Sequence, residues 1–127
     1  MVRSLKKIIK VVLWIVIFMF AAYLLLNMKY PLSYVETIDK YAEEYGVDKY
    51  LVYSMINTES GFNKEAQSHK GAKGLMQLMP MTSEEICGNL SEDVNSLDMA
   101  DPETNIKYGV YYIKQLLDKY EGNVEVA

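Results

Sequence analysis

Cysteine and histidine are almost missing from this sequence, since its 127 residues include one of each, Cys87 and His69. One cysteine cannot form a disulfide within the chain. Cys87 is interpreted as a small buried apolar residue, with a reactive thiol as the alternative. The histidine, the cysteine and the carboxylates do not have the spacing of a zinc site or of an EF-hand calcium site. We therefore expect no metal site, and the sequence implies no cofactor.

Acidic residues are absent from the first 29 positions, which carry five lysine or arginine residues. Residues 30–127 carry eight lysines and all 17 acidic residues, which gives a net charge of −9. Binding to phosphate groups needs a positively charged face. The acidic charge of the larger part therefore argues against a nucleic acid as partner. The same contrast in charge divides the chain into residues 1–29 and residues 30–127.

Charged residues are also absent from the apolar run over residues 11–26. Extended to residues 8–28, this run would span about 31 Å as a helix, which is enough to cross the core of a bilayer. The basic residues before it predict a cytoplasmic N-terminus and an outward-facing remainder, periplasmic or extracellular. A cleaved signal peptide is the alternative, but Ala21-Ala22 lies between aromatic residues and lacks the small-residue spacing of a cleavage site. We predict a single-pass anchor in the cell membrane.

Capping residues and prolines mark the helices that are expected in residues 30–127. Apolar residues recur at helical spacing over residues 35–45, and Asp48 is suited to cap a second helix. Pro80 and Pro102 are suited to the first positions of two more helices. Two segments lack such signals and are expected to be loops, residues 62–73 and 88–100. No stretch alternates over the length of a strand, so the predicted fold class is mostly α, preceded by a single transmembrane helix.

Glu59 is the carboxylate in this part of the chain that is best placed for chemistry. It follows Val52 by seven residues and Met55 by four, which puts it on the apolar face of its helix. Burial there, and the negative end of the helix dipole, would both favour the neutral acid. A neutral carboxylic acid can protonate a glycosidic oxygen. The alternative, which the spacing leaves open, is that the last helical turn frays and Glu59 is merely solvated.

A glycine-rich turn follows Glu59 at a distance of about a dozen residues. The segment Gly71–Gly74 permits a tight turn and a close approach of a ligand to the backbone. Gln77 offers both a donor and an acceptor, which suits a sugar hydroxyl or an N-acetyl amide. Four apolar residues would wall the turn against the core: Leu75, Met76, Leu78 and Met79. An ordinary loop with core methionines is the alternative interpretation.

Four blocks with these residues resemble, in order and spacing, the catalytic domain of the soluble lytic transglycosylases, which has a lysozyme-like fold. The blocks are Tyr45 to Asp48, Met55 to Phe62, Ser68 to Pro80, and Asp101-Pro102 with Asn105-Ile106 and Gly109, and the resemblance covers residues 34–127. It implies that Glu59 is the catalytic acid. It also implies that Ser60, Gly74, Met76, Gln77 and Asn105 form the substrate-binding site, with Asn105 on the helix that packs behind it.

The reaction implied by the resemblance is cleavage of the β-1,4 bond between N-acetylmuramic acid and N-acetylglucosamine in peptidoglycan. A single glutamate would serve first as acid and then as base, and the product would carry a 1,6-anhydro ring. Most glycosidases use two carboxylates, and no second inward acid is identified in this sequence. The partners implied are peptidoglycan glycan strands and the membrane, together with cell-envelope or secretion-machine proteins.

Two alternatives to this function are kept open. A hydrolytic muramidase would cleave the same bond with water. A non-catalytic peptidoglycan-binding or scaffolding module is the other, because the family pattern continues into an Ala-Tyr-Asn-Ala-Gly-like stretch. The sequence ends at Val124-Glu125-Val126-Ala127, where the helix before that stretch would begin. On this pattern the C-terminal part of the domain, with its tyrosine, is expected to be missing.

Overall fold

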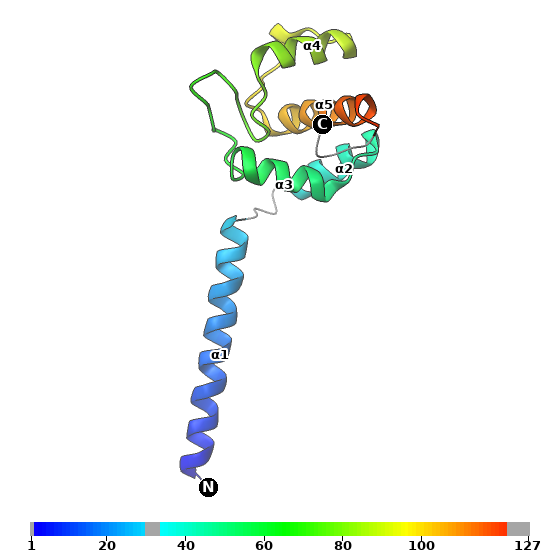
Figure 1. The fold of residues 1–127 in the computed structure, drawn as a ribbon. Coiled ribbons are helices and arrows are strands. Elements are labelled where there is room, and N and C mark those ends of the chain that lie inside the picture. Colours follow the sequence, from blue (N-terminus) through cyan, green and yellow to red (C-terminus); the bar gives the residue numbers. More distant parts are fainter. Residues whose placement is uncertain (1, 30–33, 122–127) are drawn as a thin grey trace. The chain divides into compact units, whose positions relative to one another are not determined.

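The structure, a computed structural model, describes residues 2–29 and 34–121 (Figure 1). The chain divides into two compact units, Met1–Leu32 and Ser33–Ala127. The first unit contains one helix, α1, Val2–Lys29. Its segment Lys7–Leu26 is long and apolar enough to cross a membrane. None of that segment is buried within the protein, so its apolar side chains need another apolar environment, which a bilayer provides.

The second unit is built from helices and connecting loops. Its helices are α2 (Val35–Tyr45), α3 (Lys49–Glu59), α4 (Pro80–Leu90), the short 3-10 helix η2 (Val94–Ser96) and α5 (Pro102–Lys119). Among the residues that the structure describes there is no strand, and the extended pairing is limited to isolated bridges at Gln67–Lys73 and Lys73–Leu78. The prediction of a mostly α fold is therefore confirmed.

The helix ends follow the capping signals of the sequence. The side chain of Asp48 accepts a hydrogen bond from the backbone N–H of Tyr50, and Asp101 does the same for Thr104. Gly46 ends α2 in the left-handed conformation, at φ 67°, which glycine adopts without strain. The expected loop over residues 88–100 is wrong in part, because α4 continues to Leu90 and residues 94–96 form η2.

Helix α5 is the centre of this unit, with α2 and α3 on one side and α4 on the other (Figure 1). Ile106, Val110 and Ile113 face the larger core cluster, which they share with buried residues of α2 and α3. Tyr108 faces a smaller cluster with Leu78, Ile86 and Cys87. Cys87 is 2% exposed, as expected for a small buried residue. One helix thus organises both halves of the core.

Candidate active site

Glu59 is the last residue of α3, and its side chain is exposed. The helix does bury its predicted apolar face, because Val52 and Ile56 have no exposed surface. That burial stops within the last turn, so the expected burial of Glu59 is wrong. The side chain is solvated, as in the alternative, but the last turn stays helical and does not fray. The chain then leaves the helix through Gly61 and Phe62, both with positive φ. The carboxylate is therefore open to a ligand from solution.

Ser60 links the end of α3 to the turn at residues 74–77. Its hydroxyl lies 2.7 Å from the carbonyl oxygen of Leu75 and 3.1 Å from that of Ile56. The bond to Leu75 is the shorter one and joins segments 15 residues apart in the sequence. The residue next to Glu59 is in this way attached to the turn that the sequence identified as the second half of the site.

The turn itself is closed by two backbone hydrogen bonds between Lys73 and Leu78, each of 3.0 Å. Gln77 adopts a left-handed backbone, at φ 48°, which costs a residue with a side chain roughly 1 kcal/mol. Its amide nitrogen donates to the carbonyl oxygens of Ala66 and Gly74, both at 3.0 Å. These bonds use both amide protons. The remaining polar atom, Oε1, is an acceptor that suits a sugar hydroxyl.

Asn105 lies behind the turn and has no exposed surface. Its Oδ1 accepts a hydrogen bond of 2.7 Å from the backbone N–H of Met76. Its Nδ2 donates to the carbonyl oxygens of Lys73 and Met99, at 3.0 and 2.8 Å. A side chain without exposed surface does not touch a substrate directly. The structure thus gives Asn105 contacts with the turn, where the sequence analysis expected contact with the substrate.

Gly74 and Met76 also face the protein interior. Gly74 has φ 77°, and a Cβ atom there would lie 2.4 Å from Nδ2 of Asn105. The glycine is therefore required by the close approach of the turn to α5; its contact with a ligand stays a prediction. Met76 is 7% exposed, and a Cβ atom on Gly109 would lie 2.2 Å from its sulfur. The side chain of Met76 belongs to the core, as one of the alternatives from the sequence had it.

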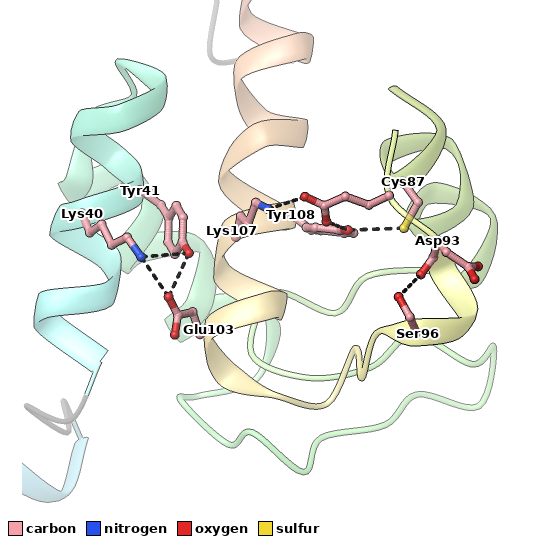
Figure 2. A network of polar contacts seen from close by, with 9 residues as sticks. Lys40, Tyr41, Cys87, Asp93, Ser96, Glu103, Lys107 and Tyr108 are labelled. Carbon is pink, nitrogen blue, oxygen red and sulfur yellow. Dashed lines mark hydrogen bonds and ion pairs between the residues drawn. The ribbon is translucent and has the colours of Figure 1, made fainter. Parts of the chain in front are cut away.

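A polar network that the sequence did not predict lies beside α5 (Figure 2). Tyr108 is fully buried and donates a hydrogen bond to Glu92, and the thiol of Cys87 lies 3.5 Å from the tyrosine oxygen. Lys107 forms an ion pair of 2.6 Å with Glu92. The hydrogen bonds from Lys107 and Tyr108 hold the pKa of Glu92 below its ordinary value. Lys107 and Tyr108 are adjacent on one helix, and nothing in the sequence indicated that both side chains contact Glu92.

Comparison with known proteins identifies the family. Residues 36–127 match the model of the transglycosylase SLT domain. The chain is 34% identical over 96 residues to membrane-bound lytic murein transglycosylase C of Sodalis glossinidius, which covers 72% of this chain and 27% of that protein. It is 35% identical over 100 residues to the transglycosylase of Enterobacteria phage PRD1, which covers 79% of this chain and 34% of that one.

Solved structures agree with these relatives. The lytic transglycosylase Slt of Pseudomonas aeruginosa, solved as an inactive glutamate-to-glutamine mutant, has a TM-score of 0.71 and 29% identity. It covers 77% of this chain and 16% of the Slt chain. The 70 kDa soluble lytic transglycosylase of Escherichia coli has a TM-score of 0.67 and 27% identity over the same shares. The chain spans between about a sixth and about a quarter of the length of the first curated relatives. It belongs to the transglycosylase SLT domain family.

Proposed function

We propose that this chain is a membrane-anchored lytic transglycosylase that cleaves peptidoglycan glycan strands, with Glu59 as its catalytic residue. The observation that carries the proposal is the exposed carboxylate of Glu59 at the end of α3, joined through Ser60 to the turn that presents Gln77. Membership of the SLT family supports this reading. So does the inactive neighbour, which differs from its parent by one glutamate-to-glutamine substitution.

The proposed reaction uses one carboxyl group twice. Glu59 donates its proton to the oxygen that joins N-acetylmuramic acid to N-acetylglucosamine, and the bond between C1 and that oxygen breaks. The N-acetyl group of the substrate stabilises the positive charge that develops at C1. Ionised Glu59 then takes the proton of the C6 hydroxyl, whose oxygen bonds to C1. The carboxyl is restored, no water is consumed, and the muramic acid ends in a 1,6-anhydro ring.

The exposed position of Glu59 suits the first step once the substrate is bound. A glycan strand lying over the end of α3 would displace water from the carboxyl and bring a glycosidic oxygen within its reach. Oε1 of Gln77 is the acceptor available to orient a sugar hydroxyl or amide. Gly74 and Met76 within the turn, and Asn105 behind it, then shape the site from the protein side.

Mass spectrometry of peptidoglycan digested by the full chain in detergent micelles tests the activity. We expect muropeptides with anhydro ends from the parent chain and none from Glu59→Gln. Glu85→Gln is the matched control, because Glu85 is an exposed glutamate on another helix, α4, and its products should equal those of the parent. Anhydro products that persist in Glu59→Gln would refute the role of Glu59.

The product separates the proposal from its two alternatives. Hydrolysis leaves a reducing end, and its product is heavier than the anhydro product by one water. A folded parent chain that binds peptidoglycan but releases no fragments would instead support a non-catalytic binding or scaffolding module.

The location proposed is the cell membrane, crossed once by α1, with the SLT domain on the outer side. Its basic N-terminal residues and its apolar segment support this orientation. An anchor in the membrane would limit the substrate to glycan close to the membrane. Protease added to cells stripped of their wall should remove the domain. A domain protected from the protease would contradict the outward orientation.

A further inference from the structure

The turn at residues 74–77 is attached to the protein from two sides. On one side Ser60, at the end of α3, is bound to the carbonyl oxygen of Leu75 at 2.7 Å. On the other side Asn105, in the first half of α5, binds the N–H of Met76 and the carbonyl oxygen of Lys73. Consecutive residues of one segment are thus bound to two different helices.

The orientation of the Asn105 amide is fixed by these contacts. One of its atoms faces a donor and the other faces two acceptors, the carbonyl oxygens of Lys73 and Met99. A reversed amide would place like groups against each other, and every hydrogen bond of the side chain would be lost. Gly74 lets the turn come close enough to α5 for these hydrogen bonds, since a Cβ atom at this position would overlap Asn105. These contacts therefore hold the turn closely against α5.

The same turn carries the left-handed backbone of Gln77, and Ser60 is the immediate neighbour of Glu59. A displacement of the turn would therefore change the separation between the acid and the residue proposed to orient the sugar. Reactions that depend on the alignment of bound groups can lose about a hundredfold in rate when a group is misplaced by about 1 Å. The attachment of the turn thus bears on the rate as well as on stability.

We infer that Ser60 and Asn105 together form a clamp that fixes the turn at residues 74–77 relative to Glu59, and that Asn105 is a positioning residue for glycan cleavage. The inference rests on the proposed function for its effect on rate. Asn105 acts entirely through the backbone of the turn, because it has no exposed surface with which to reach the substrate. Its effect on catalysis is therefore separable from substrate contact.

Asn105→Asp in the full chain in detergent micelles tests the clamp. The two side chains have the same shape, but a carboxylate places an oxygen against the carbonyl oxygens of Lys73 and Met99. We expect kcat on soluble glycan strands to fall about tenfold or more, because a misplaced group slows the reaction. We expect KM to change by less than about threefold, because Asn105 does not contact the substrate. A kcat equal to that of the parent would overturn the positioning role.

Ser60→Ala keeps the inference testable if Asn105→Asp does not fold. Its matched control is Ser83→Ala, because Ser83 is a buried serine whose hydroxyl bonds only within its own helix, to Met79 at 3.1 Å. We expect Ser60→Ala to speed the hydrogen exchange of the Met76 amide at least tenfold relative to that of Val110, and Ser83→Ala to leave this ratio unchanged. Ser60→Thr, which retains the hydroxyl, should restore the parent ratio.

The hydrogen-exchange measurement tests the clamp without any turnover of substrate. Exchange at Met76 that rises only in step with Val110 would report general destabilisation and would overturn the clamp. A parent chain that makes no anhydro product refutes the proposed function instead, and the exchange ratios of Ser60→Ala and Ser83→Ala then decide for or against the clamp alone.

Discussion

Two networks of the same residue types, a lysine, a tyrosine and a glutamate, lie on opposite sides of α5 (Figure 2). On the side of α2, Lys40 and Tyr41 both bind Glu103 at 2.9 Å. On the side of α4, the network consists of Lys107, Tyr108 and Glu92. The charged side chains of the first network are 56% and 59% exposed, and those of the second are 26% and 33% exposed.

The difference in exposure decides what each network contributes. In the first network water and salt compete for both charges, so an ion pair of this kind adds little to stability. In the second network the hydroxyl of Tyr108 lies between Glu92 and the buried thiol of Cys87. Burial, followed by the contacts with Cys87 and Glu92, raises the pKa of Tyr108 above its ordinary value. Tyr41 and Tyr108 are both buried. The networks therefore differ in their charged groups, which are more shielded from water in the second network, and in the buried thiol of Cys87, which contacts only Tyr108 of the two tyrosines.

The largest effect is expected from removing the buried hydroxyl. Tyr108→Phe leaves a carboxylate and a thiol without their shared partner, and losses of this kind cost about 2 kcal/mol. Tyr41→Phe is the matched variant on the other side of α5, and it should cost less than half as much, because water can take the place of its hydroxyl at Glu103. Urea unfolding of the full chain in detergent micelles, followed by circular dichroism, measures both free energies of unfolding.

Equal losses in the two variants would show that burial does not distinguish the networks. The contrast would then reduce to a count of hydrogen bonds, since each tyrosine hydroxyl donates one bond to its glutamate. A loss in Tyr108→Phe that disappears when Cys87 is also changed to Ala would assign the effect to the thiol rather than to Glu92.

The helices could be predicted from the sequence because their signals are local. Asp48 and Asp101 cap helices within three residues of themselves, and Pro102 occupies the first turn of α5. Apolar spacing also predicted the buried face of α3, including Val52 and Ile56. Caps and apolar faces depend on residues that are close in the sequence, so the sequence alone is enough to predict them.

The candidate site could be predicted only in part, because its geometry depends on contacts between distant segments. The ordered motifs brought Glu59, Ser60 and the turn together correctly, and Ser60 does bind Leu75. Spacing along α3 did not reveal that the buried face ends before Glu59. It also did not show that Asn105 is enclosed by the turn, because 29 residues separate Asn105 from Met76. The two networks were missed for the same reason.

The smallest effect in the comparison is expected in acid. Hydrogen bonds from Lys107 and Tyr108 hold the pKa of Glu92 below its ordinary value of 4.5, and those from Lys40 and Tyr41 do so for Glu103. Each carboxylate therefore stabilises the fold above about pH 4.5, and this contribution is lost as the pH falls through the lower folded value. In Glu92→Gln and in Glu103→Gln, the free energy of unfolding should therefore fall less between about pH 5 and about pH 3 than it does in the parent, because the glutamine does not titrate.

Salt separates the two carboxylates, because at about 1 M ionic strength charges are screened beyond roughly 3 Å. The ion pair of Glu103 with Lys40, whose charged side chains are both more than half exposed, should then contribute little, so that most of the difference between Glu103→Gln and the parent in acid should disappear. The contribution of Glu92 should persist in larger part, because the charged side chains of Lys107 and Glu92 are only 26% and 33% exposed and are therefore less screened by ions. Urea midpoints across this pH range, measured at low and high salt, give the result. If salt removed both contributions equally, the second network would be a surface ion pair like the first, and the burial of Tyr108 would not extend to its carboxylate partner.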